Sequence, residues 1–139
     1  MVKEFNSINE IKKYYNKKTN TYIFKKNGQY IDKIKFNFDL NTISHIDAWN
    51  IYGCYINVAN IDAYNINAKD IYAYNIYAKN IVAQNICAIN INACNIKADD
   101  ISYYAVCFAY ESIKCNSIKG RRENAKHFVL DGKIEIKDE

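Results

Sequence analysis

Cysteine and histidine are the residues of this sequence best suited to nucleophilic or metal chemistry, but their spacing matches neither use. The cysteines are odd in number and form no Cys-x-x-Cys pair, which favours reduced thiols over a disulfide framework or a zinc site. The two histidines, His45 and His127, lie far apart, and no Ser/His/Asp or Cys/His arrangement has a recognisable spacing. The cysteines are Cys54, Cys87, Cys94, Cys107 and Cys115.

The carboxylates of the sequence also give little support for a metal site. Asp99 and Asp100 are adjacent, but hard cations require more oxygen ligands than two side chains supply. Asp100 also falls at a position where a repeat turns, and Asp99 is expected to face solvent. The sequence therefore predicts a protein that is not an enzyme and that holds no metal or cofactor.

Basic residues gather at the two ends of the chain. Residues 1–44 carry nine lysines against four acids, whereas residues 45–110 carry three lysines against five aspartates. The sharpest cluster contains Lys119, Arg121, Arg122 and Lys126, and it could meet phosphates together with the N-terminal lysines. A solvated turn explains the same cluster more simply, because an acid, Glu123, interrupts it.

An internal repeat of five residues dominates the middle of the chain. Isoleucine recurs at every fifth position from Ile46 to Ile101. Alanine usually follows each isoleucine two places later, and asparagine usually comes directly before the isoleucine. A helix would turn each isoleucine about 140° from the last, and a straight strand would place successive isoleucines on opposite faces. Neither regular element buries the whole series.

A bend in every repeat solves this problem. Isoleucine and the following alanine then share the inner face of a short extended side, and asparagine fills the corner, because it tolerates left-handed conformations. Four such sides predict a coil of about twenty residues and a stack of about three coils. Disorder is disfavoured, since disordered tracts are poor in large aliphatic residues.

The repeats "YNINA" and "KNIVA" give the chain a resemblance to the pentapeptide-repeat family over residues of about 45–110. The resemblance implies an all-β solenoid: a right-handed, four-sided β-helix. One departure is visible, because alanine lies two places after the central isoleucine, whereas the family's small residue lies two places before its central residue.

The ends predict elements that cover the stack, since exposed β edges recruit other chains. The segment 1–44 predicts a cap made of a short helix, with Ser7 as its N-cap and Glu10 in the capping box, and a hairpin at Asn27-Gly28. The segment 111–139 predicts a second cap, a hairpin that turns at Asp131-Gly132. Residues 45–110 form the β-helix between them.

Stacking by twenty sorts the outward side chains into rows. It places Cys87 over Cys107, within the Cα separation of a disulfide, although reduced thiols are the simpler expectation. Tyrosines in such rows either pack as β ladders or bind a partner. We take the second possibility as a hypothesis for Tyr52, Tyr72 and Tyr74 on one side, and for Tyr64 and Tyr104 on another.

These features favour a non-enzymatic protein-binding module that is a monomer or homodimer. The family resemblance suggests a phage-type inhibitor of a bacterial DNA-handling or defence enzyme, although a repeat carrying only two excess negative charges is a poor mimic of DNA. Alternatives are a structural or assembly protein of a virion or spore, and nucleic-acid binding through the basic ends. The start of the sequence has no secretory signal, which predicts the cytoplasm of a bacterial or phage-infected cell and no membrane.

Overall fold

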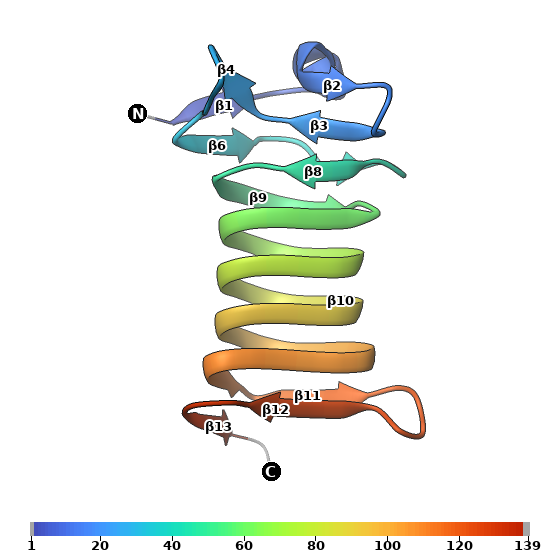
Figure 1. Cartoon of the computed structure of the whole chain (residues 1–139), viewed down its shortest axis with the longest axis vertical. Coiled ribbons are helices and arrows are strands. Elements are labelled where there is room, and N and C mark those ends of the chain that lie inside the picture. The colour runs from blue at the N-terminus through green and yellow to red at the C-terminus, as the bar shows by residue number, and fades with distance from the viewer. Residues whose placement is uncertain (1, 138–139) are drawn as a thin grey trace.

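A computed structural model of the chain describes residues 2–137 and forms a β-solenoid of about six turns (Figure 1). The predicted all-β solenoid is therefore confirmed. Residues 1, 138 and 139 of the predicted end segments lie outside the described part. The strands are β1 (Lys3–Phe5), β2 (Tyr15–Asn16), β3 (Thr21–Ile23), β4 (Lys25–Lys26), β5 (Gln29–Tyr30), β6 (Lys33–Phe36), β7 (Leu40–Asn41), β8 (His45–Asp47), β9 (Asn50–Asn57), β10 (Asn60–Cys115), β11 (Ser117–Gly120), β12 (Lys126–Val129) and β13 (Lys133–Ile136).

The central coils repeat every fifteen residues. Ile61 lies opposite Ile46 and Ile66 opposite Ile51, in parallel register. The predicted coil of twenty residues is wrong, as is the predicted stack of about three coils. Each central coil uses three pentapeptides, and parallel pairing also extends beyond residues 45–110 at both ends, through β6 and through β11 to β13.

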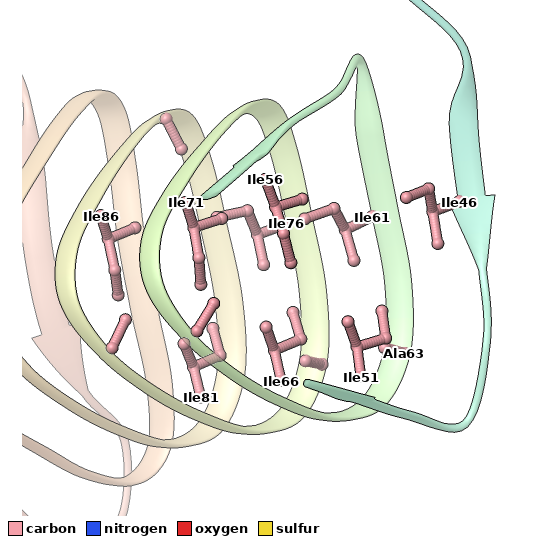
Figure 2. Packing of buried hydrophobic residues seen from close by; sticks show 14 of the residues in the cluster. Ile46, Ile51, Ile56, Ile61, Ala63, Ile66, Ile71, Ile76, Ile81 and Ile86 are labelled. Atoms are coloured by element: carbon pink, nitrogen blue, oxygen red, sulfur yellow. The ribbon is translucent and has the colours of Figure 1, made fainter. Parts of the chain in front are cut away.

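The isoleucine series is the centre of the core. All twelve side chains from Ile46 to Ile101 are 2% exposed or less, and Figure 2 shows those that it labels pointing into the coils. Ala63, Ala78 and most other alanines of the repeat are also buried, because they share the inner face two residues further along. Each fully buried isoleucine contributes about 1.5–3 kcal/mol before conformational entropy is counted.

Asparagine acts through hydrogen bonds rather than through an unusual backbone conformation. Among the described residues, positive φ angles occur only at Asn20, Asn27 and Gly28, so the predicted left-handed asparagine corners of the repeat are wrong. Instead, most of these amides donate to a side-chain oxygen one coil earlier, as the Asn80 amide does to Asn65 at 2.8 Å, and the Asn60 amide lies against a ring nitrogen of His45. Such ladders stabilise stacked parallel strands. The three ladders comprise His45, Asn60, Asn75 and Asn90; Asn50, Asn65, Asn80 and Asn95; and Asp70 with Asn85.

The N-terminal end holds a short 3-10 helix, η1 (Ile8–Tyr14), and a hairpin. The predicted helix is thus present in 3-10 form, but Ser7 makes no side-chain capping bond. A Glu10 carboxylate oxygen accepts instead from the backbone N–H of Asn6. β4 and β5 pair in antiparallel fashion around Asn27 and Gly28, both with positive φ, as a tight hairpin turn requires.

The C-terminal end continues the solenoid. The predicted hairpin at Asp131-Gly132 is wrong, because β12 and β13 both pair in parallel with β10 rather than with each other. Their apolar residues extend the inner columns: Val129 lies opposite Ala109, and Ile134 lies opposite Ile113.

The shorter coil also changes the cysteine pairs. The predicted stacking of Cys87 on Cys107 is wrong, because the central coils repeat every fifteen residues rather than every twenty. All five cysteines are free, and burial raises the pKa of the Cys107 thiol to about 12, which makes it a poor nucleophile.

Candidate functional site

A long groove on one corner of the solenoid gathers several of the predicted binding residues. Its floor is the column Val58, Ala73 and Ala88, which lies between two columns of outward side chains and itself points into the core. The groove encloses about 610 Å³. Its lining, which we call the tyrosine groove, consists of Asn41, Thr42, Ile43, Asn57, Val58, Ala59, Tyr72, Ala73, Tyr74, Cys87, Ala88, Ile89, Tyr104 and Arg121.

The two walls of the tyrosine groove carry exposed aromatic and aliphatic side chains. Tyr72 belongs to the wall before the floor column, and Tyr74 belongs to the wall after it. Tyr74 is 62% exposed, and Ile89 and Tyr104 follow it at fifteen-residue intervals on the same wall. Ile43, which is 88% exposed, lies at the N-terminal end of the groove. Exposed apolar side chains gathered along one hollow are typical of binding surfaces.

Arg121 lies at the other end of the groove. One of its guanidinium nitrogens donates to the Ala88 carbonyl oxygen at 2.6 Å, and its backbone N–H donates to the Tyr103 carbonyl at 2.7 Å. Gly120 allows this path, because a Cβ there would lie 2.9 Å from the Tyr103 hydroxyl and 2.4 Å from the Ala125 Cβ. The guanidinium keeps further N–H donors for a ligand, since arginine carries five.

The lining of the tyrosine groove carries positive charge at one end. Among residues 2–137, Arg121 is the one charged residue of the lining, and no carboxylate lines the groove. Next to it, the Arg122 guanidinium lies over the Tyr104 ring at 5.9 Å from the centroid. An anionic group at this end would therefore meet a cation with no competing acid in the lining.

The structure brings four of the nine predicted binding residues into the tyrosine groove: Tyr72, Tyr74, Tyr104 and Arg121. The predicted rows themselves are wrong, because Tyr52 lies opposite Asn67 rather than in a column with Tyr72. Tyr52 lines a separate hollow, and Tyr64 lines a second groove. Lys119, Arg122 and Lys126 are exposed but do not line the tyrosine groove.

The second groove, of about 530 Å³, runs beside a stacked aromatic column. Trp49 stacks on Tyr64 with ring centroids 4.6 Å apart, and Tyr64 accepts a hydrogen bond from Lys79 Nζ at 2.8 Å. These three residues are fifteen apart, so sequence reasoning that used the correct coil length would have found the column.

An acidic pair lies on the facing side of this second groove. Burial, with the neighbouring Asp47 charge, raises the pKa of Asp62. Asp47 Oδ1 also accepts a hydrogen bond from the Tyr30 hydroxyl at 2.6 Å, and this bond raises the pKa of Tyr30 to about 12. Asp47 is thus engaged with the N-terminal hairpin.

The histidines take part in local hydrogen bonds. His45 Nδ1 lies 2.8 Å from the Asn60 amide nitrogen, at the start of one asparagine ladder. His127 Nδ1 lies 2.6 Å from the hydroxyl of the buried Tyr103. Within residues 2–137, no group of three or more histidine, cysteine or acidic side chains is placed to hold a metal ion.

Comparisons with known protein families, with curated proteins and with solved structures found no match for this chain. In the described part of the chain, no helix has the length and apolar character needed to cross a membrane.

Proposed function

We propose that this chain is a non-enzymatic protein-binding module whose tyrosine groove holds an extended segment of a protein partner. The observation that carries the proposal is the convergence of Tyr72, Tyr74, Tyr104 and Arg121 on one groove with a floor of small side chains. Tyrosine and arginine are the residue types most enriched, with tryptophan, at the energetic centres of protein interfaces.

The shape of the groove favours an extended peptide. It crosses successive coils from Thr42 to Arg121, a path of roughly 24 Å at the spacing of neighbouring strands. About seven residues of extended chain span that length. Apolar side chains of the peptide would cover Ala73 and Ala88, and a carboxylate would pair with Arg121, because charged hydrogen bonds of this kind are strong and directional.

The proposal also includes a more specific role, a location in the cell and a family membership. They are a role as a phage-type inhibitor of a bacterial DNA-handling or defence enzyme, a cytoplasmic location, and membership of the pentapeptide-repeat family with right-handed winding. The role of residues 1–44 as a cap is supported by the burial of Phe5, Phe24 and Phe36 at that end.

Two other functions predict different behaviour in solution. Nucleic-acid binding through Lys119, Arg122 and Lys126 predicts affinity that falls steeply with added salt and that does not depend on the tyrosine groove. An assembly protein of a virion or spore predicts polymers that grow with concentration rather than a discrete complex.

The test is selection of peptides from a random displayed library on the folded full chain, followed by calorimetry of the selected peptides. We expect sequences that combine apolar residues with at least one acid. Tyr74→Ala should weaken their binding about tenfold or more, since loss of a central interface tyrosine costs at least about 1.4 kcal/mol. Arg121→Gln should abolish the preference for acidic peptides.

Tyr77→Ala is the matched control. Tyr77 is 61% exposed, nearly the same as Tyr74 at 62%, and it lines the second groove instead. Binding should be unchanged in this variant. An equal loss in both variants, or selection of no peptide, would overturn the proposal, and salt-sensitive capture of oligonucleotides by all variants would replace it with nucleic-acid binding.

A further inference from the structure

We propose that the last coil, made of β11, β12 and β13, is a self-association surface through which two copies of the chain join end to end about a two-fold axis. The inference concerns the C-terminal end of the solenoid and does not depend on the peptide-binding role of the tyrosine groove.

The backbone of the last coil is paired on one side only. Among the described residues, β11, β12 and β13 each pair with β10 and with no other strand. Each therefore presents an open edge along the same end of the solenoid, where Figure 1 shows the three strands lying together. Open edges carry unpaired N–H and C=O groups and recruit further strands.

The side chains of this coil are also incompletely covered. Ile118, Val129, Ile134 and Ile136 continue the inner columns but are only half-buried. The residues opposite them in the preceding coil, such as Ile113, are buried. The missing cover is therefore the layer that a following coil would supply.

A second copy supplies that layer on all three sides at once. The chain descends by one strand spacing per coil, so the three strands of the last coil lie at successive thirds of that spacing. A two-fold axis perpendicular to the solenoid axis, lying half a spacing beyond the middle strand, β12, then places β12 one spacing from its own copy and β11 one spacing from β13 of the copy. All three pairs are antiparallel, and a two-fold interface closes without forming a filament.

Charge selects the register of the β11–β13 pairs. With Ile118 opposite Ile136 of the partner subunit, Lys119 lies opposite Glu135 of the partner subunit, and symmetry repeats the contact. A register with Ile118 opposite Ile134 of the partner subunit would instead place Lys119 opposite Lys133 of the partner subunit. Within one copy, Lys114 Nζ already lies 4.0 Å from the Glu135 carboxylate, so Lys119 of the partner subunit would extend an alternating row. Opposite charges across antiparallel strands are favourable, and like charges are not.

The test is analytical ultracentrifugation of the full chain over a wide range of concentration. We expect a reversible equilibrium between the 16.2 kDa chain and a species of twice that mass. Lys119→Glu and Glu135→Lys should each weaken the dimer about tenfold or more, because each creates two like-charge contacts across the two-fold interface. The double variant Lys119→Glu/Glu135→Lys should restore the dimer to near the wild-type affinity.

Lys17→Glu is the control for net charge, since Lys17 is exposed at the opposite end. It should leave the dimer intact. Circular dichroism melting of each variant under monomeric conditions establishes that it is folded. A wild-type chain that stays monomeric, a mass that grows beyond the dimer, or failure of the double variant to restore association would overturn the proposal.

Discussion

The two ends of the solenoid differ in how they complete the same core. At the N-terminal end, Phe5, Phe24 and Phe36 are 1% exposed or less, and their ring centroids lie 5.6–6.1 Å apart. At the C-terminal end, the inward residues of the last coil, such as Ile134, remain half-buried, and Phe128 on its outer face is 45% exposed.

This difference shows that the repeated sequence buries the core completely only in the middle of a solenoid. Inside the stack, every isoleucine is covered by the preceding coil and the following coil. A unit of five residues is therefore enough to form and bury one face of a coil. At an end, one neighbour is missing and other residues must replace it. The N-terminal segment places large buried aromatic side chains and the helix η1 (Ile8–Tyr14) at its end, whereas the last described coil leaves an open edge.

The largest expected difference between the ends is in stability. Phe24→Ala should lower the free energy of unfolding by about 3–5 kcal/mol, because it empties a fully buried site among three other rings. Phe128→Ala should cost only about 1 kcal/mol, since its ring contacts Phe108 and is otherwise largely solvated. Denaturant unfolding at low protein concentration measures both values.

Similar losses in the two variants would contradict the comparison. A third outcome, a large loss for Phe128→Ala that appears only at high concentration, would point to burial of Phe128 in a complex and would sharpen the contrast between the free ends.

A smaller effect on the free energy of unfolding is expected where the N-terminal hairpin joins the first coils. The neutral Tyr30 hydroxyl donates to Asp47, and its pKa is raised from 10.0 to about 12. The stabilisation is therefore fully present below about pH 10 and is lost as the pH rises toward 12. Tyr30→Phe should cost less than about 1 kcal/mol at neutral pH, because the pair is partly solvated.

The difference in unfolding free energy between wild type and Tyr30→Phe, followed from neutral to alkaline pH, checks this expectation. It should shrink in the alkaline range, because the tyrosine of the unfolded chain ionises first. A constant difference, or one that grows with pH, would show that the hydrogen bond does not hold the hairpin in the way described.

Sequence reasoning predicted the class of fold well because burial leaves few choices for the isoleucine series. A period of five excludes both a helix and a straight strand, so the inward positions of Ile76 and Ala78 follow from the spacing alone. The hairpin at Asn27-Gly28 was equally accessible, since its turn requires positive φ at both residues.

The number of sides could not be predicted in the same way. A five-residue side closes into a coil of any multiple of five, and the isoleucine pattern is the same for each. The choice is made by contacts between coils, such as the bond from Asn95 to Asn80, which appear only when the stack is built. Because the outward rows depend on that choice, Tyr72 and Tyr74 were predicted as binding residues for a column that does not exist, and Trp49 and Lys79 were missed.

The fifteen-residue coil determines which side chains line the tyrosine groove, and one substitution tests it. Residue 69 lies one coil from the exposed Cys54, because the neighbouring pairs Gly53–Ala68 and Tyr55–Asp70 are in register. Neighbouring strands place such Cα atoms ~4.8 Å apart, within the range of a disulfide. Under mild oxidation, Lys69→Cys should form a crosslink between Cys54 and the introduced thiol, detected by peptide mapping and mass spectrometry. Tyr74→Cys, twenty residues from Cys54, should not form one, and a crosslink in Tyr74→Cys without one in Lys69→Cys would contradict the structure of the coil and the tyrosine groove built on it.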